Sequence, residues 1–176
     1  MISLGLLVLR IGVGLTVAAH GAQKLFGWFG GSGIQGFAGM LGQMRFSPAR
    51  GWAWAAALAE FVGGLLVAAG LLSPIGSFAI IGSMAVVILA VHARNGFWNK
   101  DGGIEFPLLI AVVALALSVS GPGALSLDQL LRIGLPEPAT WLVCAVFVLL
   151  GVGAALQSRK IARPAQEPQA HAVVTS

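Results

Sequence analysis

Five long apolar runs decide what this chain can fold into. A helix needs about 20 apolar residues to cross the hydrocarbon core of a bilayer, and each run approaches or reaches that length. The runs are continuous rather than alternating, which excludes the strands of a membrane β-barrel. The sequence therefore predicts an all-α fold, a polytopic membrane helical bundle. The five runs are residues 3–22, 52–72, 74–93, 104–120 and 139–156.

The scarcity of charged residues supports the same interpretation. Only 9% of the residues are charged and 57% are hydrophobic, whereas a soluble domain carries about 25% charged residues. The net charge of +4 comes from scattered basic residues, but a nucleic-acid-binding face requires clustered Lys and Arg. Nucleic acid is therefore excluded as a partner, and the lipid bilayer is the expected surrounding.

The connections between the runs indicate one membrane-embedded domain followed by a tail. Residues 1–157 are expected to form a four-helix core with a fifth transmembrane helix, and residues 158–176 a polar, disordered tail. Only Ser73 and Pro74 separate the second run from the third. These two helices are therefore expected to form a tight antiparallel hairpin, with Pro74 in the first turn of the later helix.

The basic residues and the tryptophans indicate how the chain sits in the bilayer. In an up-and-down path, the loops 23–51 and 94–103 and the tail share one side and carry nearly all Lys and Arg outside the runs. The other side carries only Arg132. The positive-inside rule then places the N-terminus outside and the tail in the cytoplasm. The tryptophans lie at or just beyond the ends of the runs, as interfacial anchors do.

Two ionisable residues stand deep within the apolar runs, Arg10 in the first and Glu60 in the second. Each costs about 2.5–3.5 kcal/mol on insertion scales, which makes it a functional-site hypothesis. At ~1.5 Å per residue, Glu60 lies about 13 Å and Arg10 about 15–20 Å from the cytoplasmic ends of their helices. We expect an Arg10–Glu60 ion pair near mid-membrane. Such a pair would either fix the pairing of the two helices or serve function, as a charge relay or as a charged group that binds a ligand.

A second polar group is expected just beneath the headgroups on the cytoplasmic side, where three helices end. Two imidazoles, an ammonium and a carboxylate there can hydrogen-bond the carbonyl oxygens of a quinone and move its protons. The alternative is interfacial snorkelling combined with helix capping. The candidate catalytic residues are His20, His92 and Glu105, and the candidate ligand-binding residues are Lys24, Arg10 and Glu60.

Motifs for other cofactors are missing or lack their structural context. Residues 31–36 match GxGxxG, but no strand precedes them, so a glycine-rich loop is expected rather than a nucleotide site. Cys144, the single cysteine, cannot form a CxxC pair or an iron–sulfur site and is expected to be a buried apolar side chain. A bis-histidine haem through His20 and His92 has no other support. No metal, haem, flavin or nicotinamide site is therefore expected, and electrons would come from a protein partner.

Two local patterns complete the expected organisation. Residues 20–31 and 92–103 resemble each other at an offset of 72, with both histidines and both paired glycines matching. This similarity suggests two related helix hairpins or a chance match. Ser126 is expected to cap a short helix on the outer surface, with Asp128 as the charge in its first turn.

The polar residues lie within an ordered set of short motifs. The motifs are Leu9-Arg10, His20-Gly21, Lys24-Leu25-Phe26-Gly27, Glu60, Gly63-Gly64, Gly70-Leu71, His92, Asn95-Gly96-Phe97, Gly102-Gly103-Ile104-Glu105-Phe106-Pro107, Gly121-Pro122-Gly123 and Ser126-Leu127-Asp128. Over roughly residues 5–130 this set resembles the DoxX family of small bacterial multi-pass membrane proteins. The chain departs from the family pattern in its fifth apolar run and in Ala124-Leu125, where many members carry a basic residue.

The resemblance implies a helical bundle in the bacterial cytoplasmic membrane. For part of the family it also implies membership of quinone-linked redox assemblies, including a subunit of thiosulfate:quinone oxidoreductase, or association with oxidative-stress enzymes. A quinone is then the expected cofactor and a protein the expected electron donor, while an oligomer stays open. The alternatives are a non-catalytic scaffold that assembles partner enzymes and a transporter of small solutes.

Overall fold

The computed structural model describes residues 2–161, and the fold is all-α as predicted. Four helical segments are long and apolar enough to cross a membrane, and a fifth apolar helix is shorter. All five predicted apolar runs are therefore helical, and the chain is a multi-pass membrane protein. The α-helices are α1 (Ile2–Phe26), α2 (Gly33–Gln43), α3 (Ala49–Ala69), α4 (Ile75–Val87), α5 (Glu105–Ser120), α6 (Leu127–Leu131) and α7 (Ala139–Ile161).

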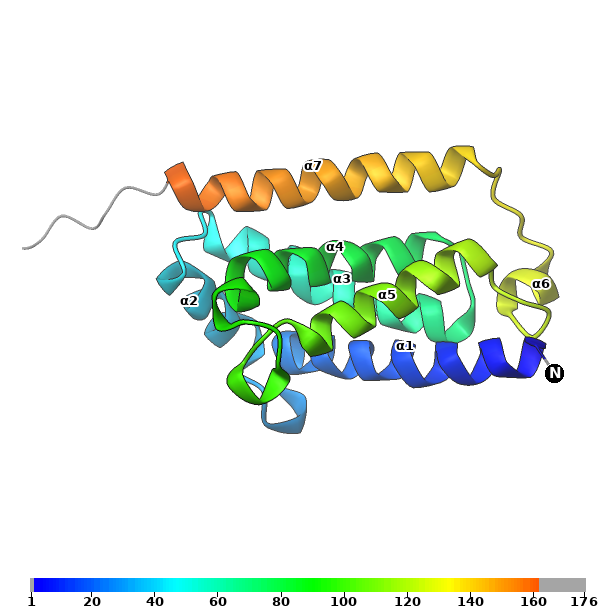
Figure 1. Cartoon of the computed structure of the whole chain (residues 1–176), viewed down its shortest axis with the longest axis horizontal. Coiled ribbons are helices and arrows are strands. Elements are labelled where there is room, and N and C mark those ends of the chain that lie inside the picture. Colours follow the sequence, from blue (N-terminus) through cyan, green and yellow to red (C-terminus); the bar gives the residue numbers. More distant parts are fainter. Residues whose placement is uncertain (1, 162–176) are drawn as a thin grey trace, which may run out of the picture.

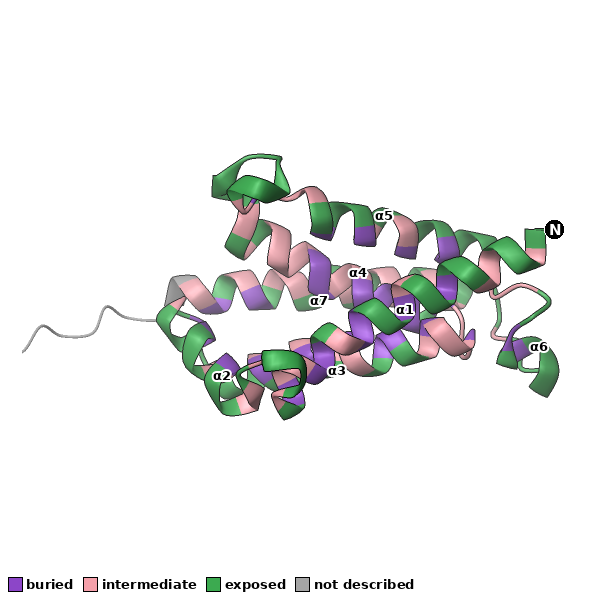
Figure 2. Ribbon diagram, turned by 90° about the horizontal axis from the view of Figure 1, so that it is seen from below, coloured by how far each residue is buried: buried purple, intermediate pink, exposed green. Residues whose placement is uncertain are grey.

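The core is formed by α1, α3, α4 and α5, with α7 outside it. The most extensive contact joins α1 to α3, and α4 packs between α3 and α5. Figure 1 shows α7 lying lengthwise along one side of the bundle, and its packing partner there is α4. Only 6% of the apolar stretch of α7 lies buried inside the bundle, against 33% of the corresponding stretch of α3. Figure 2 shows buried residues where the core helices face one another and exposed residues on their outer sides.

The connecting segments gather at the two ends of the bundle. One end holds α2, the turn from α4 to α5 and the C-terminal end of α7, whereas the start of α1 and the short helix α6 lie at the other (Figure 1). This arrangement agrees with the predicted up-and-down path. Which end faces the cytoplasm stays a prediction from the positive-inside rule.

Three local expectations differ from the structure. The segment 23–51 is not simply a loop, because it contains α2, which buries Phe37 and Leu41. The glycine-rich stretch 31–36 runs into the first turn of α2 instead of forming a loop. Finally, α7 continues to Ile161 and so extends into the predicted tail. The rest of that tail lies outside the described residues.

The two segments that resemble each other in sequence also adopt similar backbone conformations. Each contains a short 3-10 turn, Trp28–Gly30 in the first and Asn99–Asp101 in the second. Gly30 and Gly102 both take left-handed conformations, with φ of 78° and 76°. A helix follows each turn, and the starts of α2 and α5 at residues 33 and 105 reproduce the offset, since 105 − 33 = 72.

Glycines allow α1 and α3 to touch backbone to backbone. A Cβ atom added to Gly14 would lie 2.6 Å from the carbonyl oxygen of Gly64, and one added to Gly64 would lie 2.6 Å from that of Gly14. A Cβ atom on Gly21 would likewise collide with Phe61. Close approach of this kind is the usual way in which membrane helices gain packing energy. It also fixes which residues of α1 face which residues of α3.

Replacement of Gly14 by alanine is expected to destabilise the bundle, because the new methyl group has no room against α3. Overpacking typically costs about 1–3 kcal/mol, which thermal unfolding in detergent micelles would detect as a lower melting temperature. Gly12→Ala is the matched control, since open space surrounds Gly12 on the same helix. Equal melting temperatures for the two variants would contradict the backbone contact.

Candidate functional site

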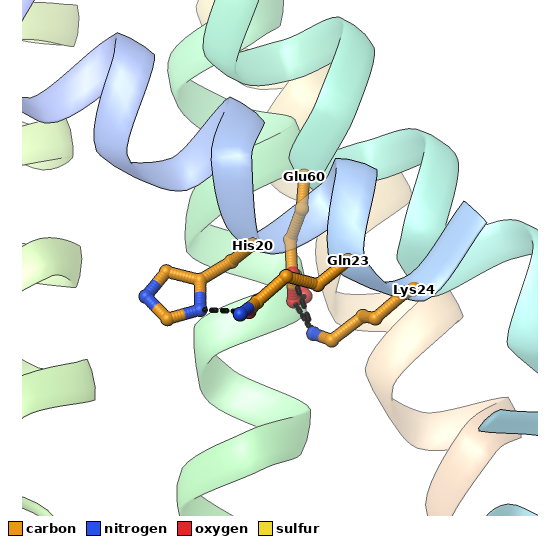
Figure 3. Close-up of polar contacts among 5 residues, drawn as sticks. His20, Gln23, Lys24 and Glu60 are labelled. Carbon is orange, nitrogen blue, oxygen red and sulfur yellow. Dashed lines mark hydrogen bonds and ion pairs between the residues drawn. The ribbon is translucent and has the colours of Figure 1, made fainter. Parts of the chain in front are cut away.

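A buried ion pair joins α1 to α3. Glu60 is fully buried, and the Nζ atom of Lys24 donates to both of its carboxylate oxygens. The hydroxyl of Ser83 on α4 donates to Oε1 of Glu60 at 2.7 Å. Figure 3 shows Lys24 and Glu60 pointing toward each other from α1 and α3. One carboxylate therefore connects three core helices.

The surroundings of the pair explain why a carboxylate can remain buried there. Two charge-assisted contacts and one hydroxyl bond satisfy the oxygens of Glu60, and removal of one partner from such a pair is strongly destabilising. The side chain of Lys24 is 23% exposed, whereas that of Glu60 is 1% exposed. Lys24 also lies over the Phe37 ring, with Nζ 5.2 Å from its centroid. The ammonium is thus the outer member of the pair.

The predicted Arg10–Glu60 pair is wrong, because Arg10 lies at the other end of the bundle. Its Nη2 donates to the carbonyl oxygen of Leu125 at 2.5 Å, and its guanidinium packs against Gly70. The sequence estimate of depth took residues 22 and 52 as the cytoplasmic ends of the two helices, whereas α1 continues to Phe26 and α3 already begins at Ala49. The glycine contacts between α1 and α3 instead place Arg10 beside Gly70 and bring Lys24 close to Glu60.

Arg10 belongs to a buried polar cluster that fastens α6 to the bundle. The carboxylate of Asp128 accepts hydrogen bonds from the backbone of Leu72 at 2.8 Å and of Ser73 at 2.9 Å, and its charge acts on Arg10. The predicted cap is confirmed, since Oγ of Ser126 accepts from the backbone of Gln129. Besides lying in the first turn of α6, Asp128 therefore holds the turn between α3 and α4.

The four residues predicted to surround a quinone headgroup make separate contacts. Nδ1 of His20 lies 3.2 Å from the Gln23 side-chain oxygen, and the imidazole stands away from the ion pair (Figure 3). The His20 ring also packs edge-on against Phe106. Glu105 accepts a hydrogen bond from the backbone of Asn99 at 2.9 Å.

His92 lies in a π-helical turn, Ile88–His92, that continues α4. Its Nδ1 donates to the carbonyl oxygen of Gly102 at 2.5 Å. A π-helical turn inside an α-helix often marks a functional position. Of the four predicted headgroup residues, Lys24 and His92 line one cavity, whereas His20 and Glu105 lie outside its lining.

This cavity occupies about 730 Å³ between α3, α4 and α7, with α2 at one end. Its size falls within the ~300–1,000 Å³ range of ligand pockets. The walls consist mainly of Ala, Val, Phe and Gly residues, and only a few of the lining residues are polar. The polar and sulfur-containing lining residues, apart from Met40, are Lys24, Trp52, Glu60, Ser83, His92, Thr140 and Cys144.

Trp52 supplies a hydrogen-bond donor that has no partner within the described part of the chain. Its indole lines the cavity, and its Nε1 atom is buried without an acceptor. A buried donor left unsatisfied costs about 1–3 kcal/mol, so an acceptor brought by a ligand would be favoured there. From the sequence alone Trp52 is an interfacial anchor, and its position at the end of an apolar run gives no signal for this role.

Arg159 fastens α7 to the bundle at the end where α2 lies. Its Nε donates to the carbonyl oxygen of Met44 and its Nη1 to that of Ala90, both at 3.1 Å. The guanidinium also lies over the Phe46 ring, 5.2 Å from its centroid. Ala90 belongs to the π-helical turn, so this arginine joins α7 to both α2 and the end of α4. From the sequence, Arg159 could be recognised only as one of the basic residues that gather on one side of the membrane.

These features define a small multi-pass membrane protein, a helical bundle with an apolar cavity beside a buried ion pair. The sequence model of the DoxX family matches residues 5–93, just over half of the 176-residue chain, and the chain belongs to this family. The matched region contains Lys24, Glu60, Ser83 and His92, whereas α5, α6 and α7 lie beyond it. Neither the curated proteins nor the solved structures contain a match to the chain.

Loss of Lys24 alone is expected to destabilise the protein. Lys24→Met leaves the carboxylate of Glu60 buried without its cation, and breaking a buried pair in this way costs about 3–5 kcal/mol. The double variant Lys24→Met/Glu60→Met removes both charges and should recover much of that loss. Thermal unfolding of the purified variants in one detergent would compare them.

Arg50→Met serves as the control for this comparison, because Arg50 is an exposed basic residue in the first turn of α3, the helix that carries Glu60. It should unfold like the unaltered protein. If Lys24→Met unfolds at the same temperature as Arg50→Met, the ion pair contributes nothing to the bundle and the interpretation fails.

Proposed function

We propose that this protein is the quinone-binding membrane subunit of a redox assembly in the bacterial cytoplasmic membrane. The observation that carries the proposal is the apolar cavity, whose wall contains the Lys24–Glu60 pair and Ser83. Quinone-linked redox assemblies are also what the DoxX resemblance implies for part of the family. Electrons would come from a protein partner.

The donors in the cavity suit the carbonyl oxygens of a quinone. A quinone combines an apolar ring and chain with two hydrogen-bond acceptors, and ligand pockets typically pair apolar walls with a few convergent polar groups. The indole N–H of Trp52 is an unpartnered donor within the described residues, and the Lys24 ammonium in the same lining keeps a third N–H beyond the two that Glu60 accepts. The residues present therefore fit the group.

Two residues of the lining are suited to moving the protons that accompany quinone chemistry. The Lys24 ammonium contacts the buried carboxylate of Glu60 and belongs to a side chain that is 23% exposed, so Nζ can give a proton to a reduced quinone oxygen and take up another from outside. Nδ1 of His92 is engaged with the carbonyl of Gly102, so in a neutral ring Nε2 is the proton-accepting atom. His20 and Glu105 do not line the cavity and have no part in this proposal.

The proposed orientation connects these protons with the cytoplasm. Lys24, α2 and the end of α7 lie at the end of the bundle where the basic segments gather, and the positive-inside rule places that end in the cytoplasm. A transporter of hydrophilic solutes is less well supported, because the cavity walls are mainly apolar. A pure scaffold would have no use for the cavity or for the unpartnered donor in it.

Narrowing the cavity is expected to weaken quinone binding. Gly151 lines the cavity with open space beside it, so Gly151→Leu inserts a side chain without a clash. The affinity for a short-chain quinone should fall by about tenfold or more, or at least 1.4 kcal/mol, in equilibrium binding to the purified protein. Gly153→Leu is the matched control, since Gly153 has the same open surroundings on α7 but does not line the cavity. Equal quinone binding by both variants would refute the proposal.

Removal of the indole N–H is expected to weaken quinone binding without affecting stability. Trp52→Phe takes away a donor that makes no bond within the described residues, so unfolding should not change. Binding should weaken about fivefold, which corresponds to one net hydrogen bond of about 1 kcal/mol. Trp54→Phe on the same helix is the control, because Trp54 is exposed and outside the cavity. If both variants bind quinone equally well, Trp52 does not contact the headgroup.

A further inference from the structure

Both ends of α7 are fastened to the bundle. Near its start, Trp141 packs edge-on against Phe78 of α4, with ring centroids 5.0 Å apart. Near its end, Arg159 binds the carbonyl oxygens of Met44 and Ala90. These anchors fix both ends of α7 against the bundle.

Between the anchors, α7 packs along only one of the two helices that form the opposite cavity wall. Val148 is in ordinary contact distance of Gly82, where an added Cβ atom would lie 3.5 Å away. Extensive contacts join α7 to α4, whereas no comparable contact joins α7 to α3. The edge of the cavity between α3 and α7 is therefore not closed by packing of one helix against the other.

Exposed lining residues mark an opening along that edge. On α7 they are Val143, Phe147 and Gly151, which recur every four residues and so form one stripe. On α3 the corresponding exposed residue is Ala55, whose small side chain leaves room. At 1.5 Å per residue, the α7 stripe runs from about 6 to 18 Å into its helix. The opening therefore faces the hydrocarbon layer rather than water.

We propose that the cavity is loaded sideways from the bilayer, through the opening between α3 and α7. The site then selects molecules already dissolved in the membrane, with an uncharged hydrogen-bonding headgroup and an apolar chain. The headgroup moves inward to the donors of Lys24 and Trp52, while the chain stays in the opening between the two helices. The identity of the headgroup rests on the proposed quinone function, but the route does not.

The single cysteine provides a direct test of the route. Cys144 lines the cavity and no other cysteine competes with it. In bilayer nanodiscs, a membrane-soluble maleimide should label Cys144, whereas a charged maleimide with access to both surfaces should not. Equally fast labelling by the charged reagent would show that the cavity opens to water and would overturn the proposal.

Variants at the opening sharpen this test. Ala55→Phe is expected to slow labelling by the membrane-soluble reagent about tenfold, because a close-packed ring in the opening leaves no way past it. Phe147→Ala removes an exposed ring from the other side and should accelerate labelling. Ala116→Phe, on an exposed position of α5 away from the cavity, is the control. Labelling rates that do not differ between Ala55→Phe and Ala116→Phe would place the opening elsewhere and overturn the proposal.

The labelling experiment needs no quinone, so its outcome separates the two proposals. If Cys144 labels only from the membrane and Ala55→Phe slows it, the route stands even when the purified protein binds no quinone. If quinone binds but the charged reagent labels Cys144 at the same rate, the quinone site stands and the lateral route fails. If short-chain quinone associates more slowly with Ala55→Phe than with Ala116→Phe, the result would support both the quinone site and the lateral route.

Discussion

The backbone contact between α1 and α3 is the constraint on which the rest of the structure depends. Gly14, Gly21 and Gly64 let the two helices approach until their main chains touch, and this closeness permits only one register. That register brings Lys24 to Glu60 at one end and Arg10 to Gly70 at the other. Both buried polar clusters follow from it. The ion pair is therefore a result of glycine placement as much as of its own charges.

The helices could be predicted because the bilayer imposes a simple rule on sequence. A long apolar run must satisfy its own backbone hydrogen bonds in lipid, and each of the five runs does so as a helix. The Ser126 cap was also readable, since its chemistry is local. The pairing of Glu60 with Lys24 could not be predicted, because it depends on where α1 ends, where α3 begins and which of the many glycines make contact. Lys24 was a candidate ligand-binding residue from the sequence, but its pairing with Glu60 was not predicted.

The cavity had no equivalent signal in the sequence. It exists because α7 packs along α4 and leaves α3 uncovered, which is a fact of tertiary packing. Ser83 is one of two serines in an apolar run, and Trp52 has the position of an interfacial anchor, so neither pattern indicates a cavity-lining residue. His92 was singled out correctly as a polar residue ending a helix, and it does line the cavity. The amphipathic helix α2 was overlooked because glycines interrupt its short apolar pattern.

The place of α7 in the sequence has a consequence for how such a site can arise. The DoxX match ends at residue 93, before α7 begins, yet it already contains the charged half of the cavity wall. Without α7, that wall would be a shallow furrow filled by acyl chains, with the carboxylate of Glu60 still held by Lys24 and Ser83. One additional helix, fixed by Arg159, turns the furrow into a cavity that is open along one edge. Substitutions on α7 can therefore change which guest fits the cavity while the wall that holds the ion pair stays unaltered.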